Sequence, residues 1–132
     1  MATKNRIFIA FAIEDANLRT FLVGQARNER SPFEFVDMSV KEPWDEEWKK
    51  KCRIKIKGCD GVIGIVTLNS PRATGQLWEL DCAYAEGIPV HYLHGYSDDA
   101  KRLPVDKRPS PIKGHHVHDW TWPNIKGFLD GL

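Results

Sequence analysis

The sequence predicts an α/β fold in which about five parallel strands form a doubly wound sheet with the flavodoxin-like order 2-1-3-4-5. Two observations lead to this prediction. Nearly continuous apolar runs occur at residues 6–12 and 61–68, as expected of strands that are buried on both faces. Segments with a helical spacing of apolar residues lie between the predicted strands, and parallel strands require such crossovers. The length of 132 residues fits a single domain over residues 1–132.

The first predicted strand, residues 6–12, leads into a helix. Asp15 is placed to cap this helix, because a carboxylate accepts hydrogen bonds from the free N–H groups of a first turn. Apolar residues then recur at helical spacing, at Leu18, Phe21, Leu22 and Ala26. Residues 33–36 follow Pro32 and are predicted to form the second strand.

Residues 45–59 allow two interpretations. Residues 52–57 alternate between polar and apolar side chains, as in a half-buried strand. However, Asp45 followed by two glutamates is typical of a helix start. One helical stripe would also carry Trp48, Cys52, Ile56 and Cys59. We favour the helix, because the neighbouring strands are predicted to be parallel and need a crossover.

The second half continues the alternation. Residues 61–68 are the most apolar segment and are predicted to form the central strand. The next helix, residues 74–86, should use Leu77, Leu80 and Tyr84 as its core stripe and end at Gly87 in the C′ position. A fourth strand (88–93), a loop of about 20 residues (95–114) and a short last strand (116–120) follow. The final helix begins near Thr121, with an apolar edge of Ile125, Phe128 and Leu129.

Composition excludes several classes of protein. The net charge of +1 provides no electrostatic attraction for nucleic acid or an anionic membrane, so neither is expected as a partner. The sequence has no apolar run long enough to span a bilayer and no signal-peptide pattern, which predicts a soluble, cytoplasmic protein. Its three cysteines form no CxxC pair, so we expect buried thiols in place of a disulfide framework.

The candidate site lies where the predicted winding reverses, at the carboxyl ends of the first and third strands. The first strand contributes Phe11, Ala12 and Asp15, the second Asp37 and Ser39, and the third Thr67, Asn69 and Ser70. Glu79 lies just beyond, beside Trp78, on the helix that leaves the third strand. A carboxylate, an aromatic ring and small polar groups at this place are typical of a ligand pocket.

Structural alternatives exist for these residues. Asp15 is more often a helix cap than a ligand, Ser39 is equally well explained as a loop-ordering residue, and a glutamate such as Glu79 is common on a helix surface. The histidines at 115, 116 and 118 lack partners at ligand spacing apart from Asp119, so no metal site is predicted. Nucleotide-binding glycine loops and a nucleophile elbow are absent from the sequence. A phosphoacceptor receiver domain needs an aspartate where the third strand here is followed by Asn69.

Several segments together resemble TIR domains. Residues 7–11, followed by Glu14 and Asp15, are similar to the "FISY" strand and acidic turn that open these domains. Residues 35–39 resemble the "F-x-D-x-S" second strand of the TIR-like branch that includes the Thoeris anti-phage sensors. Residues 78–90 resemble the "W-E-I…A…G-K-P-V" segment of that branch. Two departures are Ala10 in place of the "FISY" serine, and residues 73–76, which lack the tryptophan that many relatives carry there.

This resemblance implies a TIR-like fold and an NAD⁺ glycohydrolase or ADP-ribosyl cyclase activity. The family's catalytic glutamate falls on Glu79; Phe11 and Ala12 would line the nicotinamide or ribose side, and Asp37, Ser39 and Trp44 would shape the pocket. We also expect Asn69 and Trp78 to contact substrate. NAD⁺ would be a substrate, with no cofactor. Self-association and a separate effector, activated by a cyclic or conjugated ADP-ribose product in anti-phage defence, are implied as well.

Two other functions remain open from the sequence. One is a non-catalytic, TIR-like interaction module. The other is an enzyme similar to nucleoside deoxyribosyltransferases, which also place a carboxylate at the ribose C1 atom. In either enzymatic case a carboxylate would stabilise the oxocarbenium-like cation that forms as the glycosidic bond breaks.

Overall fold

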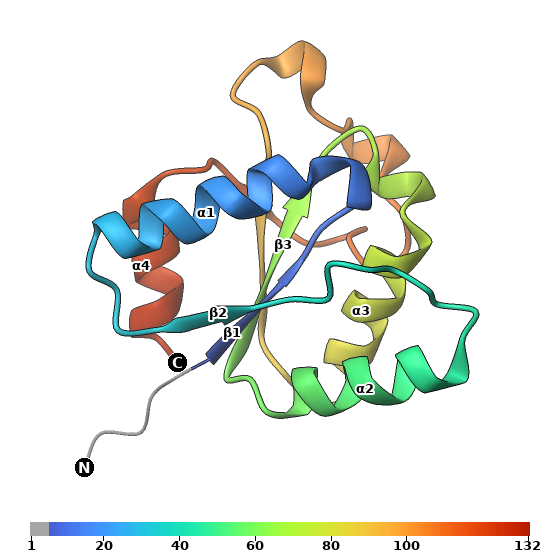
Figure 1. Ribbon diagram of the computed structural model, residues 1–132. Helices are drawn as coiled ribbons and strands as arrows, with labels where there is room; N and C mark the ends of the chain where they lie inside the picture. Colours follow the sequence, from blue (N-terminus) through green and yellow to red (C-terminus); the bar gives the residue numbers. More distant parts are fainter. Residues whose placement is uncertain (1–5) are drawn as a thin grey trace.

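The computed structural model describes residues 6–132 and contains a five-stranded parallel sheet with the order β2-β1-β3-β4-β5 (Figure 1). The strands are β1 (Arg6–Ala10), β2 (Glu34–Val36), β3 (Gly61–Val66), β4 (Val90–His94) and β5 (Val117–His118). The predicted flavodoxin-like α/β fold and its strand order are therefore confirmed. All six residues of β3 are buried, as expected of the central strand.

Four helices cover the two faces of the sheet (Figure 1). Helices α1 (Ala16–Asn28) and α4 (Trp122–Asp130) pack on one face, where Ile7, Ile9 and Ile63 point. Helices α2 (Glu46–Lys57) and α3 (Thr74–Ala85) pack on the other face, against Phe8 and Val62. None of the helices between residues 6 and 132 has the length and apolar content that a membrane crossing requires.

The ambiguous segment at residues 45–59 is helical. Asp45 caps α2 by accepting a hydrogen bond from the backbone N–H of Glu47 at 2.9 Å. Trp48, Cys52 and Ile56 form its buried stripe, which is the stripe predicted from their spacing. The alternative strand is thus wrong, because the cap and the 3.6-residue period act together over the whole segment.

Two predicted helix stripes need correction. In α1, Leu22 and Ala26 are buried, but Phe21 is 64% exposed and contacts Trp120 edge-on. In α3, Tyr84 is partly exposed, and the buried face consists of Gly75, Gln76, Glu79, Leu80, Cys82 and Ala83. Leu80 is buried and Leu77 is half-buried against the core, as predicted, but the other buried positions of α3 carry small or polar side chains. The predicted C′ glycine is confirmed: Gly87 has a φ of +69°, and the next N–H bonds the carbonyl of Ala83 at 2.9 Å.

The segment between β4 and β5 is more structured than the predicted 20-residue loop. It contains the short 3-10 helices η3 (Asp99–Lys101) and η4 (Val105–Lys107), and it buries Leu103 and Ile112 against the core on the α2 and α3 face. The Tyr92 hydroxyl donates to the carbonyl of Pro111 at 2.9 Å. Anchoring by buried side chains explains why this polar-looking segment has a fixed path. The three cysteines are free and buried, as predicted.

Candidate functional site

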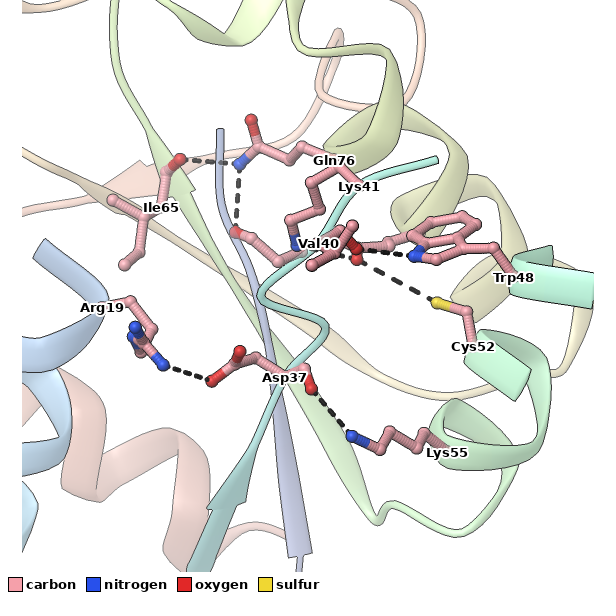
Figure 2. Close-up of polar contacts among 11 residues, drawn as sticks. Arg19, Asp37, Val40, Lys41, Trp48, Cys52, Lys55, Ile65 and Gln76 are labelled. Carbon is pink, nitrogen blue, oxygen red and sulfur yellow. Dashed lines mark hydrogen bonds and ion pairs between the residues drawn. The ribbon is translucent and has the colours of Figure 1, made fainter. Parts of the chain in front are cut away.

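The side chain of Glu79 is completely buried and is bound by a single lysine. Glu79 lies on the face of α3 that packs against the sheet, and its two carboxylate oxygens accept hydrogen bonds from Nζ of Lys41 at 2.9 and 2.8 Å. Lys41 belongs to the connection between β2 and α2, and only 5% of its side chain is exposed (Figure 2). This bidentate ion pair is the most deeply buried charge pair of the described residues.

Apolar and weakly polar groups complete the surroundings of this ion pair. The Phe11 ring centroid lies 4.1 Å from Nζ of Lys41, an arrangement that stabilises the ammonium through the ring's negative face. The Cys52 thiol lies 4.0 Å from Glu79 Oε2. Burial raises the pKa of Glu79 to about 8, Lys41 opposes that rise, and the charge of Asp37 adds to it. The carboxyl group is therefore poised to change its protonation state near neutral pH.

A hollow of about 240 Å³ opens beside Lys41. Its wall is formed by the 3-10 helix η1 (Ile13–Asp15), the connection at Lys41 and Trp44, and the first turn of α3. Trp44 is 74% exposed at this hollow. Glu79 lies behind Lys41, so the lysine separates the carboxylate from the open space. The predicted carboxylate is near a hollow, but it is not open to it in this conformation.

Gln76 connects α3 to the end of the sheet. Its Nε2 donates to the carbonyls of Ala10 in β1 at 3.0 Å and of Ile65 in β3 at 2.7 Å (Figure 2). These two bonds lie where the winding of the sheet reverses, and they fix the orientation of the amide. Gln76 is 1% exposed and lines the hollow, yet its Oε1 has no hydrogen-bond partner among the described residues. A buried acceptor without a partner is uncommon in folded proteins.

Asp15 does not cap α1, so this prediction is wrong. Its carboxylate accepts hydrogen bonds from the Thr67 hydroxyl at 2.5 Å and from the Asn69 amide at 2.9 Å, and it is 1% exposed. The Ser70 hydroxyl accepts the backbone N–H of Thr67 at 3.0 Å. A tertiary network that ties the end of β1 to the end of β3 has taken the place of the local cap. The network brings together four residues of the predicted site, Asp15, Thr67, Asn69 and Ser70.

Asp37 and Ser39 have different environments. Asp37 forms an ion pair with Arg19 of α1 at 3.2 Å, and its backbone carbonyl accepts a hydrogen bond from Lys55 of α2 at 3.0 Å (Figure 2). Through these two contacts, Asp37 attaches the start of the connection between β2 and α2 to a helix on each face of the sheet. The same connection contains Lys41. Ser39 is exposed on the same connection. Ala12 is buried and supplies the carbonyl that begins η1.

Trp78 faces away from the hollow. Its ring packs edge-on against Trp48 of α2 at a centroid distance of 5.4 Å, and the Arg53 guanidinium lies 5.6 Å above it. Together with charged residues of α2, Trp78 lines a separate surface hollow of about 610 Å³. Adjacent helix residues point about 100° apart, so Trp78 and Glu79 contact different neighbours.

The structure thus brings Phe11, Asp15, Asn69 and Glu79 to the carboxyl end of the sheet, with Trp44 at the hollow and Trp78 outside it. Lys41 and Gln76 also belong to the site, although neither was predicted from the sequence. Gln76 precedes Glu79 by one helical turn, a spacing that places two residues on the same face. No comparable signal marks Lys41, because 38 positions separate it from Glu79.

The histidines cluster on β4 and β5 without forming a metal centre. The ring of His91 stacks on His118 at 4.2 Å and on Phe128 at 4.9 Å, and His116 contacts His118 edge-on at 4.4 Å. Within residues 6–132, no group of three or more potential ligands has the geometry to hold a metal ion. Burial, together with the smaller effect of the neighbouring imidazoles of His118 and His116, lowers the pKa of His91 to about 4.

Comparison with known proteins adds no assignment to this geometry. No protein-family model matches the sequence, and no curated protein matches it. A functional conclusion therefore depends on the residues themselves.

Proposed function

We propose that the protein is a TIR-like enzyme that cleaves the nicotinamide–ribose bond of NAD⁺, with Glu79 as its catalytic carboxylate. The observation that carries the proposal is the position of Glu79: a completely buried carboxylate beside the point where the winding of the sheet reverses, next to a hollow. Purely structural carboxylates are seldom buried to this extent, because desolvation of the charge is costly.

Cleavage of the nicotinamide–ribose bond requires an anionic group beside the ribose and few other catalytic groups. The bond between C1′ of the ribose and the pyridinium nitrogen breaks, and its electron pair leaves with nicotinamide, which becomes neutral. The ribose ring is left with an oxocarbenium-like positive charge. An ionised Glu79 stabilises this charge more strongly in the transition state than in the bound substrate, and burial strengthens the effect.

Capture of the cation then determines the product. Attack by water at C1′, followed by loss of a proton, gives ADP-ribose. Attack by a hydroxyl of the same molecule, with loss of its proton, gives a cyclic product. Released products of this kind are suited to activate a separate effector in anti-phage defence, and assembly of several copies is part of the proposal.

A test compares three proteins with NAD⁺ as substrate and measures released nicotinamide by chromatography. The wild type should release it, Glu79→Gln should not, and Glu86→Gln should behave as the wild type. Glu86 lies beyond the far end of α3 and pairs with Arg53, so it controls for loss of one carboxylate. Absence of turnover at every protein concentration would contradict the proposal, whereas exchange of bases on deoxynucleosides would favour a deoxyribosyltransferase-like enzyme.

One observation favours a second candidate, a non-catalytic interaction module. Lys41 neutralises Glu79 and separates it from the hollow, as expected if the ion pair only stabilises the fold. The two functions differ in the effect of Glu79→Gln. In a module this substitution should lower stability without changing any turnover of NAD⁺.

A further inference from the structure

Catalysis by Glu79 requires a change at Lys41. While both carboxylate oxygens bind the ammonium, the charge of Glu79 is compensated and cannot act on a sugar cation. Removing Lys41 without a substitute leaves a buried, unpaired carboxylate, which is strongly unfavourable. A substrate that supplies both an anion and a positively charged pyridinium–ribose group would remove this obstacle, because the anion could take over the ammonium while the positive group replaces it beside Glu79.

The hollow beside Lys41 is lined with groups that attract an anion. Lys41 forms part of its wall, and Arg72 is exposed at the same place, where the two cations outnumber the single exposed carboxylate of Glu14. The first turn of α3 also faces it, at Thr74 and Gly75, and in the part of the chain that is described no side chain caps this turn. Free N–H groups and the helix dipole favour phosphate at such a terminus.

Gln76 supplies an independent sign of a ligand. Its amide nitrogen is fixed by two backbone carbonyls, so the oxygen is the only part left to bind anything else. This oxygen is buried at the hollow without a partner in residues 6–132. A carboxamide oxygen accepts hydrogen bonds, which a phosphate oxygen cannot donate but a sugar hydroxyl can. The hollow therefore offers donors for an anion and one acceptor for a hydroxyl group. A ribosyl phosphate carries both of the matching groups.

We propose that the hollow binds the phosphorylated ribose of the substrate, and that the phosphate takes Lys41 from Glu79 and so frees the carboxylate for catalysis. The inference rests on the proposed function and narrows the substrate to phosphorylated nucleosides. A nucleoside without phosphate cannot take Lys41 away, so the charge of Glu79 remains compensated when such a nucleoside binds. Phosphate and Glu79 compete for one ammonium, so each weakens the binding of the other to Lys41.

This competition predicts an unusual result, in which removing the catalytic carboxylate tightens binding. ADP-ribose should bind Glu79→Gln about tenfold or more tightly than it binds the wild type, because Lys41 is already free. The gain should be absent in the double variant Lys41→Met/Glu79→Gln. Adenosine, which has no phosphate, should show no gain, and Glu86→Gln should bind ADP-ribose as the wild type does. Titration calorimetry at a pH above the Glu79 pKa of about 8, where the carboxylate is ionised, measures all of these affinities.

Arg72 gives a second measurement that does not depend on the buried pair. Arg72→Met alters an exposed side chain and should weaken ADP-ribose binding about fivefold while leaving adenosine unaffected. Lys49→Met, which removes an exposed ion pair with Glu46 outside the hollow, is the matched control and should change neither affinity. If Glu79→Gln does not fold, the Arg72 and Lys49 variants still decide whether the hollow binds phosphate.

Turnover separates this inference from the proposed function. Nicotinamide mononucleotide and nicotinamide riboside share the scissile bond and differ only in the 5′-phosphate, and we expect the wild type to prefer the mononucleotide about 100-fold in kcat/KM. Equal rates would overturn the inference and leave NAD⁺ cleavage intact. Tighter ADP-ribose binding by Glu79→Gln without any nicotinamide release would overturn the enzyme and leave the phosphate site. Unchanged binding in Glu79→Gln, or a gain that persists without Lys41, contradicts the exchange of the ammonium.

Discussion

Lys41 crosses α3 at Gly75, where a Cβ atom on residue 75 would lie 2.6 Å from the Cβ atom of Lys41. Real Cβ atoms do not approach this closely, so the glycine creates the space through which the lysine reaches Glu79. Gly75 is the second residue of α3. A lysine from another part of the chain occupies the space beside the first turn of this helix.

The Gly75→Ala substitution should therefore destabilise the protein. An alanine in a helix is normally favourable by up to about 1 kcal/mol, but the overlap with Lys41 should reverse the sign and cost about 1–3 kcal/mol. Gly24→Ala in α1 is the control, since a Cβ atom there has no heavy atom within 4 Å apart from its chain neighbours and the nearby backbone of its own helix. Denaturant unfolding of both variants measures the difference. A stabilised Gly75→Ala protein would show that Lys41 does not need this space.

The activity should rise with pH through the pKa of Glu79. Burial raises this pKa to about 8, so the carboxyl group is mostly protonated below that value and ionised above it. Only the ionised form stabilises a sugar cation. The kcat/KM for NAD⁺ should thus increase about tenfold per pH unit below pH 8 and level off above it. A flat profile between pH 6 and 9 would exclude Glu79 as the group that must lose a proton.

Asp15→Ser distinguishes a helix cap from a tertiary network. Serine caps helices as well as aspartate does, but it is too short to accept bonds from both Thr67 and Asn69. We expect the free energy of unfolding to fall by about 2–3 kcal/mol, because buried donors lose their acceptor. Asp45→Ser, at the true cap of α2, should cost less than about 0.5 kcal/mol. An equal loss of unfolding free energy in the two variants would indicate that Asp15 acts as a helix cap after all.

The two tryptophans that were predicted to bind substrate should respond differently. Trp44→Ala removes an exposed ring at the hollow and should raise KM for NAD⁺ about tenfold with little change in stability. Trp78→Ala removes the contact with Trp48 and should lower stability by about 2–4 kcal/mol while KM stays the same. Steady-state kinetics together with denaturant unfolding separate these effects. A higher KM in Trp78→Ala would place the substrate between α2 and α3.

Acid should destabilise the fold through His91. Its pKa is about 4 in the folded protein and about 6.5 when unfolded, so the unfolded chain binds the extra proton first. The stability contributed by neutral His91 is complete above pH 6.5 and is lost as the pH falls toward 4. His91→Phe keeps the stacking against Phe128 and should reduce the loss between pH 7.5 and 4.5 by roughly 1–3 kcal/mol. His115→Gln, which removes an exposed imidazole, should retain the parental loss.

The sequence was sufficient for the architecture because its signals are local. A cap at Asp45, a stripe from Trp48 to Ile56 and apolar runs in β1 and β3 each act over a few residues, and the parallel order follows from them. Predictions failed where a distant partner outweighed a local preference. Asp15 binds the end of β3 and does not cap α1, and the apparently open segment after β4 is anchored by Leu103 and Ile112.

The candidate site was predictable only in part. The strand ends and Glu79 could be placed together, because the reversal of winding fixes where parallel strands finish. Lys41 could not, since its contact with Glu79 depends on the path of the connection between β2 and α2 and on the space at Gly75. Neither the path of this connection nor the space at Gly75 produces a periodic pattern in the sequence. The contact between Lys41 and Glu79 therefore became visible only in three dimensions.

The indole of Trp48 donates a hydrogen bond at 2.6 Å to the carbonyl of Val40, the residue immediately before Lys41. Any excursion of the lysine that moves its backbone must alter this bond, and with it the emission of the indole. Trp48 is therefore an intrinsic fluorescent probe of the backbone next to Lys41. In a background where the other four tryptophans are replaced, stopped-flow fluorescence would time the departure of the lysine directly.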